Sequence, residues 1–350
     1  MQTIIKKTDV NDIDMEVIEQ ASDILKAGGM VAFPTETVYG LGADALDEKA
    51  SAKIYEAKGR PSDNPLIVHV ADTKQLEPLV KNIPDTARKL MDKFWPGPMT
   101  LIFEKSDIVP SGTTGGLATV AIRMPNHPVA LSLISNSGVA IAAPSANTSG
   151  RPSPTTAQHV ETDLDGRIDM IIDGGAVGIG IESTIVDVTV NPPMILRPGY
   201  ITKKMLEDVV GNVEVDKAIL GKMSPDVKPK APGMKYKHYA PKAELTMFRG
   251  ERQAVATHIN DISRQAESEG KKVGVIASDE TFSMYEWGNV VSIGTRNDDD
   301  SIARNLYGVL RKFDDMNVDV IYSETFDDDG LGQAIMNRML KAAGYNVLQV

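Results

Sequence analysis

The chain has 350 residues, of which 42% are hydrophobic and 24% charged, which is typical of a globular protein long enough for two domains. Its formal net charge of -11 argues against binding nucleic acid mainly by bulk charge, because such binding depends on neutralising phosphates. The absence of cysteine excludes disulfides, zinc–thiolate sites and thiol nucleophiles. The N-terminal residues have no apolar signal core, and no run approaches the roughly 18 apolar residues of a membrane span, so we expect a cytoplasmic protein that enters no membrane.

Residues 1–210 alternate strand-like and helix-like patterns. One amphipathic helix is expected from Asp47, a suitable N-cap, to the stop at Gly59, and another over 84–97. Short apolar runs predict strands at 30–35, 66–70, 99–104, 119–125, 139–145, 169–175, 183–189 and 194–199. We therefore predict an α/β domain over 1–210 with a twisted, mixed sheet.

Residues 211–241 have a different composition. They are rich in Pro, Gly and Lys and carry a net charge of +3, between segments of -8 (1–210) and -6 (242–350). A solvated tether is one interpretation. Met234, Tyr236 and Tyr239 favour another, because apolar and aromatic side chains need a surface to pack on.

Residues 242–350 alternate strand and helix patterns in a simpler order. This alternation predicts a smaller, mostly parallel, doubly wound (Rossmann-like) domain. Strands are expected at 243–250, 271–279, 289–294 and 318–326, and helices at 251–269, 301–316 and 330–344.

The common nucleotide and hydrolase motifs are missing. The sequence contains no GxxxxGK[ST] loop, no GxGxxG after a strand, no HExxH and no GxSxG. A nucleotide would therefore have to be bound by a different motif.

Two loops, one after a strand and one between a helix and a strand, are candidates for nucleotide binding. FPTETVYGLGADA (33–45) is either a plain strand–loop–helix connection or a ligand loop at the exit of a strand. EAKGRPSDNPLIVHV (56–70) presents Lys58 at a helix end and Arg60 in a segment stiffened by prolines, which is suited to cradling an anion such as phosphate. His69, on the strand that follows, is by itself more typical of a core histidine.

Further polar or cationic residues follow other strands. Arg123 lies at the end of the short apolar strand in TVAIRMP (119–125). PSANTSGRPSP (144–154) is rich in hydroxyl and amide groups, and ESTIVD (182–187) and LRPG (196–199) also place polar or cationic residues beside strands. Each segment alone could be an ordinary turn. Together they predict a site built from several strand ends with at least three cationic groups.

These motifs, in this order and spacing, resemble the YrdC-like family, the threonylcarbamoyl-AMP synthases, over residues 15–210. PGMKYKHYAP (232–241) and the second α/β domain resemble the family's longer, two-domain form. The resemblance implies a nucleotidyltransferase that makes L-threonylcarbamoyladenylate and pyrophosphate from L-threonine, bicarbonate or CO2, and ATP. Mg2+ would accompany the ATP phosphates, with no ligands from protein side chains.

The resemblance also assigns residues. It implies a signature tetrad of Lys58, Arg60, Ser145 and Asn147. It implies threonine-side residues Thr35, His69, Arg123, Ala143 (through its backbone) and Ser183. It implies nucleotide-side residues Lys58, Ser62, Thr119, Ser145, Ser153, Arg197 and Tyr236.

The implied chemistry agrees with the residue types. A carbamate anion must attack the α-phosphate of an anionic ATP, so the site must supply fixed positive charge before reaction, as Lys58, Arg60 and Arg197 could. An unstable carbamate needs water kept out, so we expect Lys228–Pro241 to form a lid. Other proteins would then transfer the threonylcarbamoyl group to tRNA, with weak or no direct tRNA binding here.

Two alternatives remain at this stage. Hydrogenase-maturation carbamoyltransferases share the domain but carry cysteine-rich zinc motifs, which this chain lacks. An RNA-binding module would suit a basic cleft, but the net charge of -8 over 1–210 argues against tight, charge-driven binding.

Overall fold

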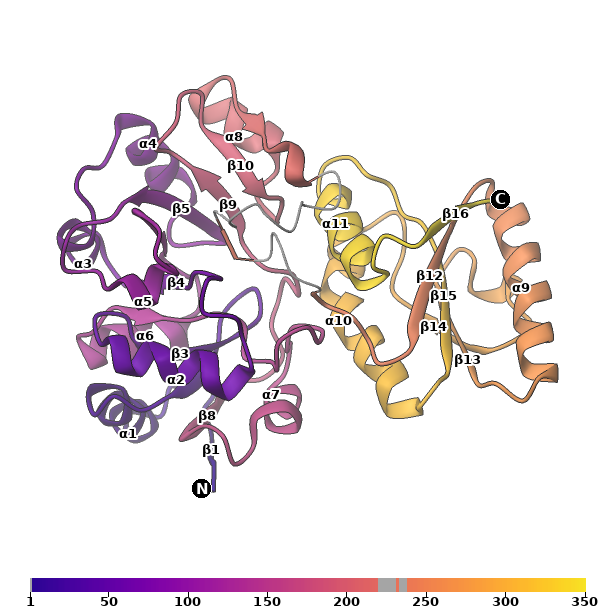
Figure 1. Ribbon diagram of the computed structural model, residues 1–350, viewed down its shortest axis with the longest axis horizontal. Coiled ribbons are helices and arrows are strands. Elements are labelled where there is room, and N and C mark those ends of the chain that lie inside the picture. The colour runs from indigo at the N-terminus through magenta and orange to yellow at the C-terminus, as the bar shows by residue number, and fades with distance from the viewer. Residues whose placement is uncertain (1, 220–230, 233–237) are drawn as a thin grey trace. The chain divides into compact units, whose positions relative to one another are not determined.

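A computed structural model of the chain describes residues 2–219, 231–232 and 238–350 (Figure 1). The chain divides into two compact units, a larger one, Met1–Ser149 with Ser153–Lys235, and a smaller one, Gly150–Pro152 with Tyr236–Val350. Tyr236 and most of the expected lid lie outside the described residues.

The larger unit is built on an 11-stranded mixed sheet in the order β1-β8-β2-β3-β7-β4-β6-β5-β9-β10-β11. Its strands are β1 (Ile4–Lys7), β2 (Val31–Pro34), β3 (Tyr39–Asp44), β4 (Ile67–His69), β5 (Met99–Glu104), β6 (Thr119–Arg123), β7 (Ile141–Ala142), β8 (Met170–Asp173), β9 (Thr184–Asp187), β10 (Met194–Arg197) and β11 (Glu214–Val215). Its helices are α1 (Met15–Lys26), α2 (Glu48–Lys58), α3 (Thr73–Leu76), α4 (Asp85–Phe94), α5 (Ser111–Thr114), α6 (Pro128–Ser137), α7 (Ala157–Leu164) and α8 (Lys203–Val210), with short 3-10 turns η1 (Glu77–Leu79) and η2 (Lys217–Ile219).

Hydrophobic cores cover both faces of this sheet. Val31 and Phe33 lie in the core beneath α1 and α6, whereas Ala32 lies in the core shared with α2 and α4. This alternation follows from the two-residue period of a strand. The predicted α/β class with a mixed sheet is confirmed, and the two-sided burial explains why its strands appeared in the sequence as short apolar runs.

One segment differs from the simple connection considered for 33–45. Tyr39–Asp44 is a strand that pairs antiparallel with β2, so 33–45 is a hairpin rather than a strand–loop–helix connection. Gly40 and Gly42 concealed this strand, because glycine has low strand propensity. A Cβ on Gly42 would lie 2.7 Å from Ile141 and 2.8 Å from Phe33, so close packing requires glycine there.

The helix that precedes the candidate loop begins and ends where the sequence predicts. The Asp47 side chain caps α2 by accepting from the backbone N–H of Lys49 (2.8 Å). Gly59 ends the helix in the left-handed conformation at φ 60°. These two signals fix where the chain turns into the Arg60 loop.

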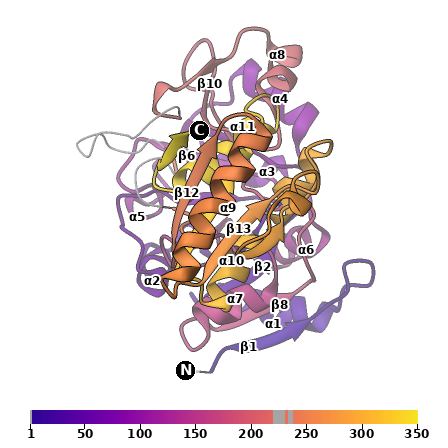
Figure 2. The ribbon, with the colours of Figure 1, turned by 90° about the vertical axis from the view of Figure 1, so that its right-hand side faces the viewer.

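The smaller unit has a 5-stranded sheet in the order β14-β13-β15-β12-β16, and all of its pairings are parallel. Helix α9 lies on one side of this sheet, and α10 and α11 lie on the other (Figures 1 and 2). This arrangement confirms the predicted doubly wound domain. The elements are β12 (Glu244–Arg249), α9 (Arg252–Ser268), β13 (Val273–Ala277), η3 (Phe282–Met284), β14 (Asn289–Ser292), α10 (Asp299–Met316), β15 (Val320–Glu324), α11 (Gly332–Ala342) and β16 (Val347–Gln349).

Across the described residues, every helix is too short or too polar to cross a membrane.

Candidate active site

Lys58 joins the end of α2 to the loop that follows β7. Its side chain is buried, and its ammonium donates to the backbone carbonyls of Ser145 and Asn147. In return, the backbone N–H of Ser149 donates to the Lys58 carbonyl (2.8 Å). The structure therefore brings Lys58, Ser145 and Asn147 together, and it uses the lysine charge to hold the loop in shape.

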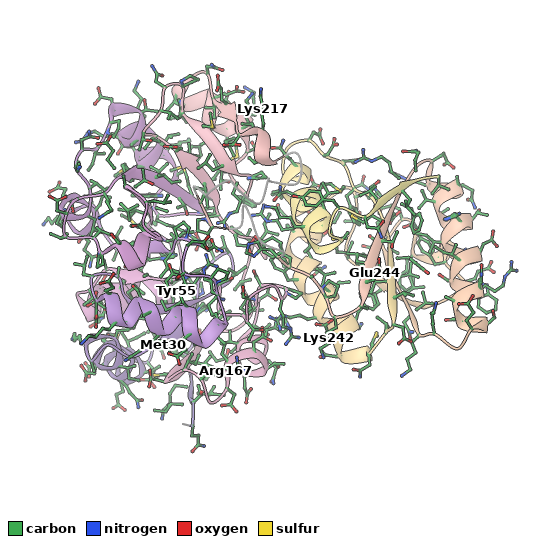
Figure 3. The ribbon with its side chains drawn as sticks, in the orientation of Figure 1. Met30, Tyr55, Arg167, Lys217, Lys242 and Glu244 are labelled. Atoms are coloured by element: carbon green, nitrogen blue, oxygen red, sulfur yellow. The ribbon has the colours of Figure 1, made fainter. Side chains whose placement is uncertain are left out.

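The Arg60 loop is closed by its own guanidinium. Arg60 donates from Nε to the Asn64 carbonyl (3.2 Å) and from Nη2 to the Pro65 carbonyl (3.0 Å). Tyr55, which projects from α2 in Figure 3, donates to the carbonyls of Gly112 (3.0 Å) and Asn64 (3.3 Å). These bonds give the loop a defined conformation around a cation.

Asn64 belongs to the loop that the sequence predicts as an anion cradle, and its side chain points inward. Its side chain is 1% exposed, and neither amide atom has a hydrogen-bond partner among the described residues. A buried amide without partners is costly, so it calls for an explanation, and a ligand beside the loop would provide one. Nothing in the sequence distinguishes its inward orientation from that of Ser62, which is exposed.

The tight turn between β2 and β3 directs two side chains at Arg123. The Thr35 hydroxyl donates to the Val38 carbonyl (2.7 Å) and lies 2.9 Å from the Thr37 hydroxyl, so it holds the turn. At the tip of the turn, Glu36 Oε2 lies 2.7 Å from Arg123 Nη2, and the Thr37 hydroxyl accepts from Arg123 Nη1 (2.9 Å). The assignment of Thr35 to threonine stays a prediction, and Glu36 and Thr37 join the candidate site.

Strand register places His69, Arg123 and Thr100 side by side across three strands. Arg123 on β6 is opposite His69 on β4 and Thr100 on β5. Burial, with a smaller effect from the Arg123 charge, lowers the pKa of His69 to about 3, so its imidazole is neutral at pH 7. The histidine contributes a neutral ring, which also lies edge-on to Phe33.

The row continues towards β9 and β10. The hydroxyls of Thr100 and Ser183 lie 2.7 Å apart, and Arg197 donates to the hydroxyl and the carbonyl of Ser183 (both 3.1 Å). The Ser153 hydroxyl donates to Glu182 Oε1 (2.5 Å), next to Ser183 in the chain. Ser153, Ser183 and Arg197, all predicted from the sequence, are therefore gathered at one place.

The remaining predicted residues lie further out or outside the described chain. Thr119 begins β6 and Arg123 ends it, so the two are about 13 Å apart along the strand. The backbone N–H of Ala143 is already bonded to the Ile67 carbonyl (2.8 Å). Ser62 is exposed and Tyr236 lies outside the described residues.

His127, the residue before α6, also belongs to the Arg123 neighbourhood. Burial lowers its pKa, although the Glu36 carboxylate has the opposite effect. Its Nδ1 is buried and has no hydrogen-bond partner within the described part of the chain. The sequence analysis did not single it out.

The described residues contain no group of three or more His, Asp or Glu side chains that could hold a metal ion. Magnesium bound through nucleotide phosphates stays a prediction. The gathered groups are cations, hydroxyls, amides and a buried acid–base pair, which suit an anionic ligand and a small polar one rather than a covalent nucleophile.

Two family models match the chain. A family model for Sua5, YciO and YrdC proteins, described as telomere recombination, matches residues 23–199. A model described as threonylcarbamoyl-AMP synthase, C-terminal domain, matches residues 201–344.

The similar proteins span nearly the whole chain. The threonylcarbamoyl-AMP synthases of Pyrococcus abyssi and Bacillus subtilis are each 51% identical over 333 residues, covering 95% of this chain and 96% and 94% of theirs. A crystal structure of P. abyssi Sua5 complexed with L-threonine superposes with a TM-score of 0.93 at 49% identity, covering 99% of this chain and 100% of that one.

Proposed function

This chain belongs to the threonylcarbamoyl-AMP synthase family, and we propose that it joins L-threonine, bicarbonate or CO2, and ATP to give threonylcarbamoyl-AMP and pyrophosphate. The observation that carries the proposal is the row of His69, Arg123, Thr100, Ser183 and Arg197 across the sheet. A relative of nearly the same fold has been crystallised with L-threonine.

In this reaction the site would have to bring together two anionic reactants, the carbamate of threonine and ATP. The Arg123 guanidinium would bind the threonine carboxylate, since arginine matches a carboxylate in shape and charge. Neutral His69 is opposite Arg123 on one side, and Thr100, which contacts the Ser183 hydroxyl, is opposite it on the other. His69 and Ser183 would orient the small substrate without adding charge.

The nucleotide would lie along the other side of the row. Arg197 and Arg60 would offset the charge of the phosphates. The side chains of Ser145, Asn147 and Ser153 would donate hydrogen bonds to the nucleotide, and Thr119 would lie at the far end of the nucleotide. Asn64 is added to this set because its buried amide has no partner among the described residues. Mg2+ bound by the phosphates would offset further negative charge.

The product would serve tRNA modification, in which separate transferase proteins pass the threonylcarbamoyl group to adenosine. Direct RNA binding by this chain is expected to be weak or absent, given the net charge of -11.

A lid formed by Lys228–Pro241 would exclude water from the carbamate. Deleting that segment while both units stay folded should lower adenylate formation, and unchanged formation would exclude a lid.

The decisive experiment is direct. The protein is incubated with ATP, labelled L-threonine and bicarbonate, and the adenylate and pyrophosphate are measured by mass spectrometry and a coupled assay. Ser145→Ala should raise the KM for ATP without changing thermal stability. A protein that releases no threonine-dependent pyrophosphate but shifts tRNA in a gel would support the RNA-binding alternative.

A further inference from the structure

The ion pair between Glu36 and Arg123 is close but poorly aligned. Arg123 Nη2 and Glu36 Oε2 are 2.7 Å apart, and the two side chains are 5% and 12% exposed. Neither Glu36 oxygen, nor Arg123 Nε or Nη2, has a well-directed hydrogen bond with any described residue. Among the described residues, the Arg123 guanidinium donates one well-directed hydrogen bond, from Nη1 to the Thr37 hydroxyl (2.9 Å). The buried hydrogen-bonding capacity of both ions is therefore largely unused, which is unusual in a folded core.

The charge of this neighbourhood sums to zero. The Arg123 cation and the Glu36 anion cancel, and the two nearby imidazoles are neutral at pH 7, since burial lowers the pKa of His69 to about 3 and also lowers that of His127. A simple anion bound at Arg123 would leave an uncompensated negative charge on Glu36, which is costly in a buried site. A zwitterion would keep the total at zero and supply a partner to each ion.

We propose that Glu36 is the residue that binds the ammonium group of the amino-acid substrate, which inserts between Glu36 and Arg123. The substrate carboxylate then pairs with Arg123, and its ammonium pairs with Glu36. This inference rests on the proposed function and deepens it, because it names the group that selects α-amino acids over other carboxylates.

The fold allows such an insertion. Arg123 is the last residue of β6 and lies within the sheet, paired on both sides, whereas Glu36 sits at the tip of the four-residue turn 35–38. The Thr35 hydroxyl holds the turn itself in place. Insertion would therefore require only the glutamate side chain to rotate, while the backbone and the arginine stay in place.

The test compares two ligands with the free protein, by calorimetry without ATP. L-threonine carries both charges, and 2,3-dihydroxybutanoate replaces the ammonium with a hydroxyl. Wild type should bind threonine at least tenfold more tightly than the hydroxy acid. Glu36→Gln should weaken threonine binding by roughly tenfold to a hundredfold, as expected for a hydrogen bond to a charged group, and leave the hydroxy acid unchanged or tighter. Glu56→Gln, an exposed glutamate on α2, is the matched control and should change neither.

Equal weakening of both ligands in Glu36→Gln would mean that Glu36 only positions Arg123, and it would overturn the inference. So would equal binding of the two ligands by wild type, a result that does not depend on the variant folding. Failure of the proposed function is distinguishable, because wild type would then form no adenylate from threonine. If wild type forms the adenylate but binds the two ligands equally well, only the proposed role of Glu36 is rejected.

Discussion

Lys58 provides the sharpest test of how the site is held together. Replacing it with Met keeps the apolar stem and removes the ammonium, so the carbonyls of Ser145 and Asn147 lose this charged donor. A hydrogen bond to a charged group contributes about 1.5–3 kcal/mol, and one of these contacts is only partly buried. We therefore expect Lys58→Met to lower the free energy of unfolding of the larger unit by about 2–4 kcal/mol.

Urea titration followed by tryptophan fluorescence measures this change. The chain has two tryptophans, and a Trp287→Phe background leaves Trp95, in the larger unit, as the only reporter. Lys53→Met is the matched control on the same helix, because Lys53 is exposed and donates once, to the Gly28 carbonyl (2.6 Å). It should cost less than about 1 kcal/mol. A Lys58→Met effect below about 0.5 kcal/mol would show that the ammonium does not support this loop.

Three further predictions concern the same region. Arg60→Ala should reduce adenylate formation by about a hundredfold or more, and turnover like wild type would refute the anion cradle. It should also lower stability by about 1–3 kcal/mol, because the guanidinium donates to the carbonyls of Asn64 and Pro65. Asn64→Leu removes a buried amide that has no partner among the described residues. The thermal unfolding temperature should therefore be unchanged or higher, while pyrophosphate release falls. A lower unfolding temperature would point to a structural role. Because the pKa of His69 is lowered in the folded state, its contribution to stability is present above about pH 6.5 and is lost as the pH falls. Wild type should therefore lose about 1 kcal/mol more than His69→Gln between pH 6 and pH 5, measured by urea unfolding at each pH, and parallel losses would contradict the assignment.

The fold class was predictable because the strongest signals are local. The Asp47 cap and the Gly59 stop predicted where α2 begins and ends, and the apolar runs predicted most of the central strands. The sequence could not reveal β3, because Gly42 is required there by packing against Ile141, which is distant in the chain, and Phe33, which lies across the hairpin.

The candidate site was only partly predictable for a related reason. Residue type identified Arg123 and Arg197 as cations beside strands, but their partners depend on register and turn geometry. The contact of Glu36 with Arg123 and the inward orientation of Asn64 are products of tertiary packing, so residue type alone could not assign them. Likewise, only the structure shows that Lys58 donates to carbonyls of its own protein.

The row from His69 to Arg197 is assembled from strands that are distant in the chain but adjacent in the sheet. Because side chains alternate between faces, inserting one residue into β6 would turn Arg123 away from its neighbours while leaving the strand in place. Such a chain could look native by secondary structure and still lack a working centre. Recovery of enzymatic turnover after refolding would thus report correct alignment of the strands, a property that far-ultraviolet spectra do not detect.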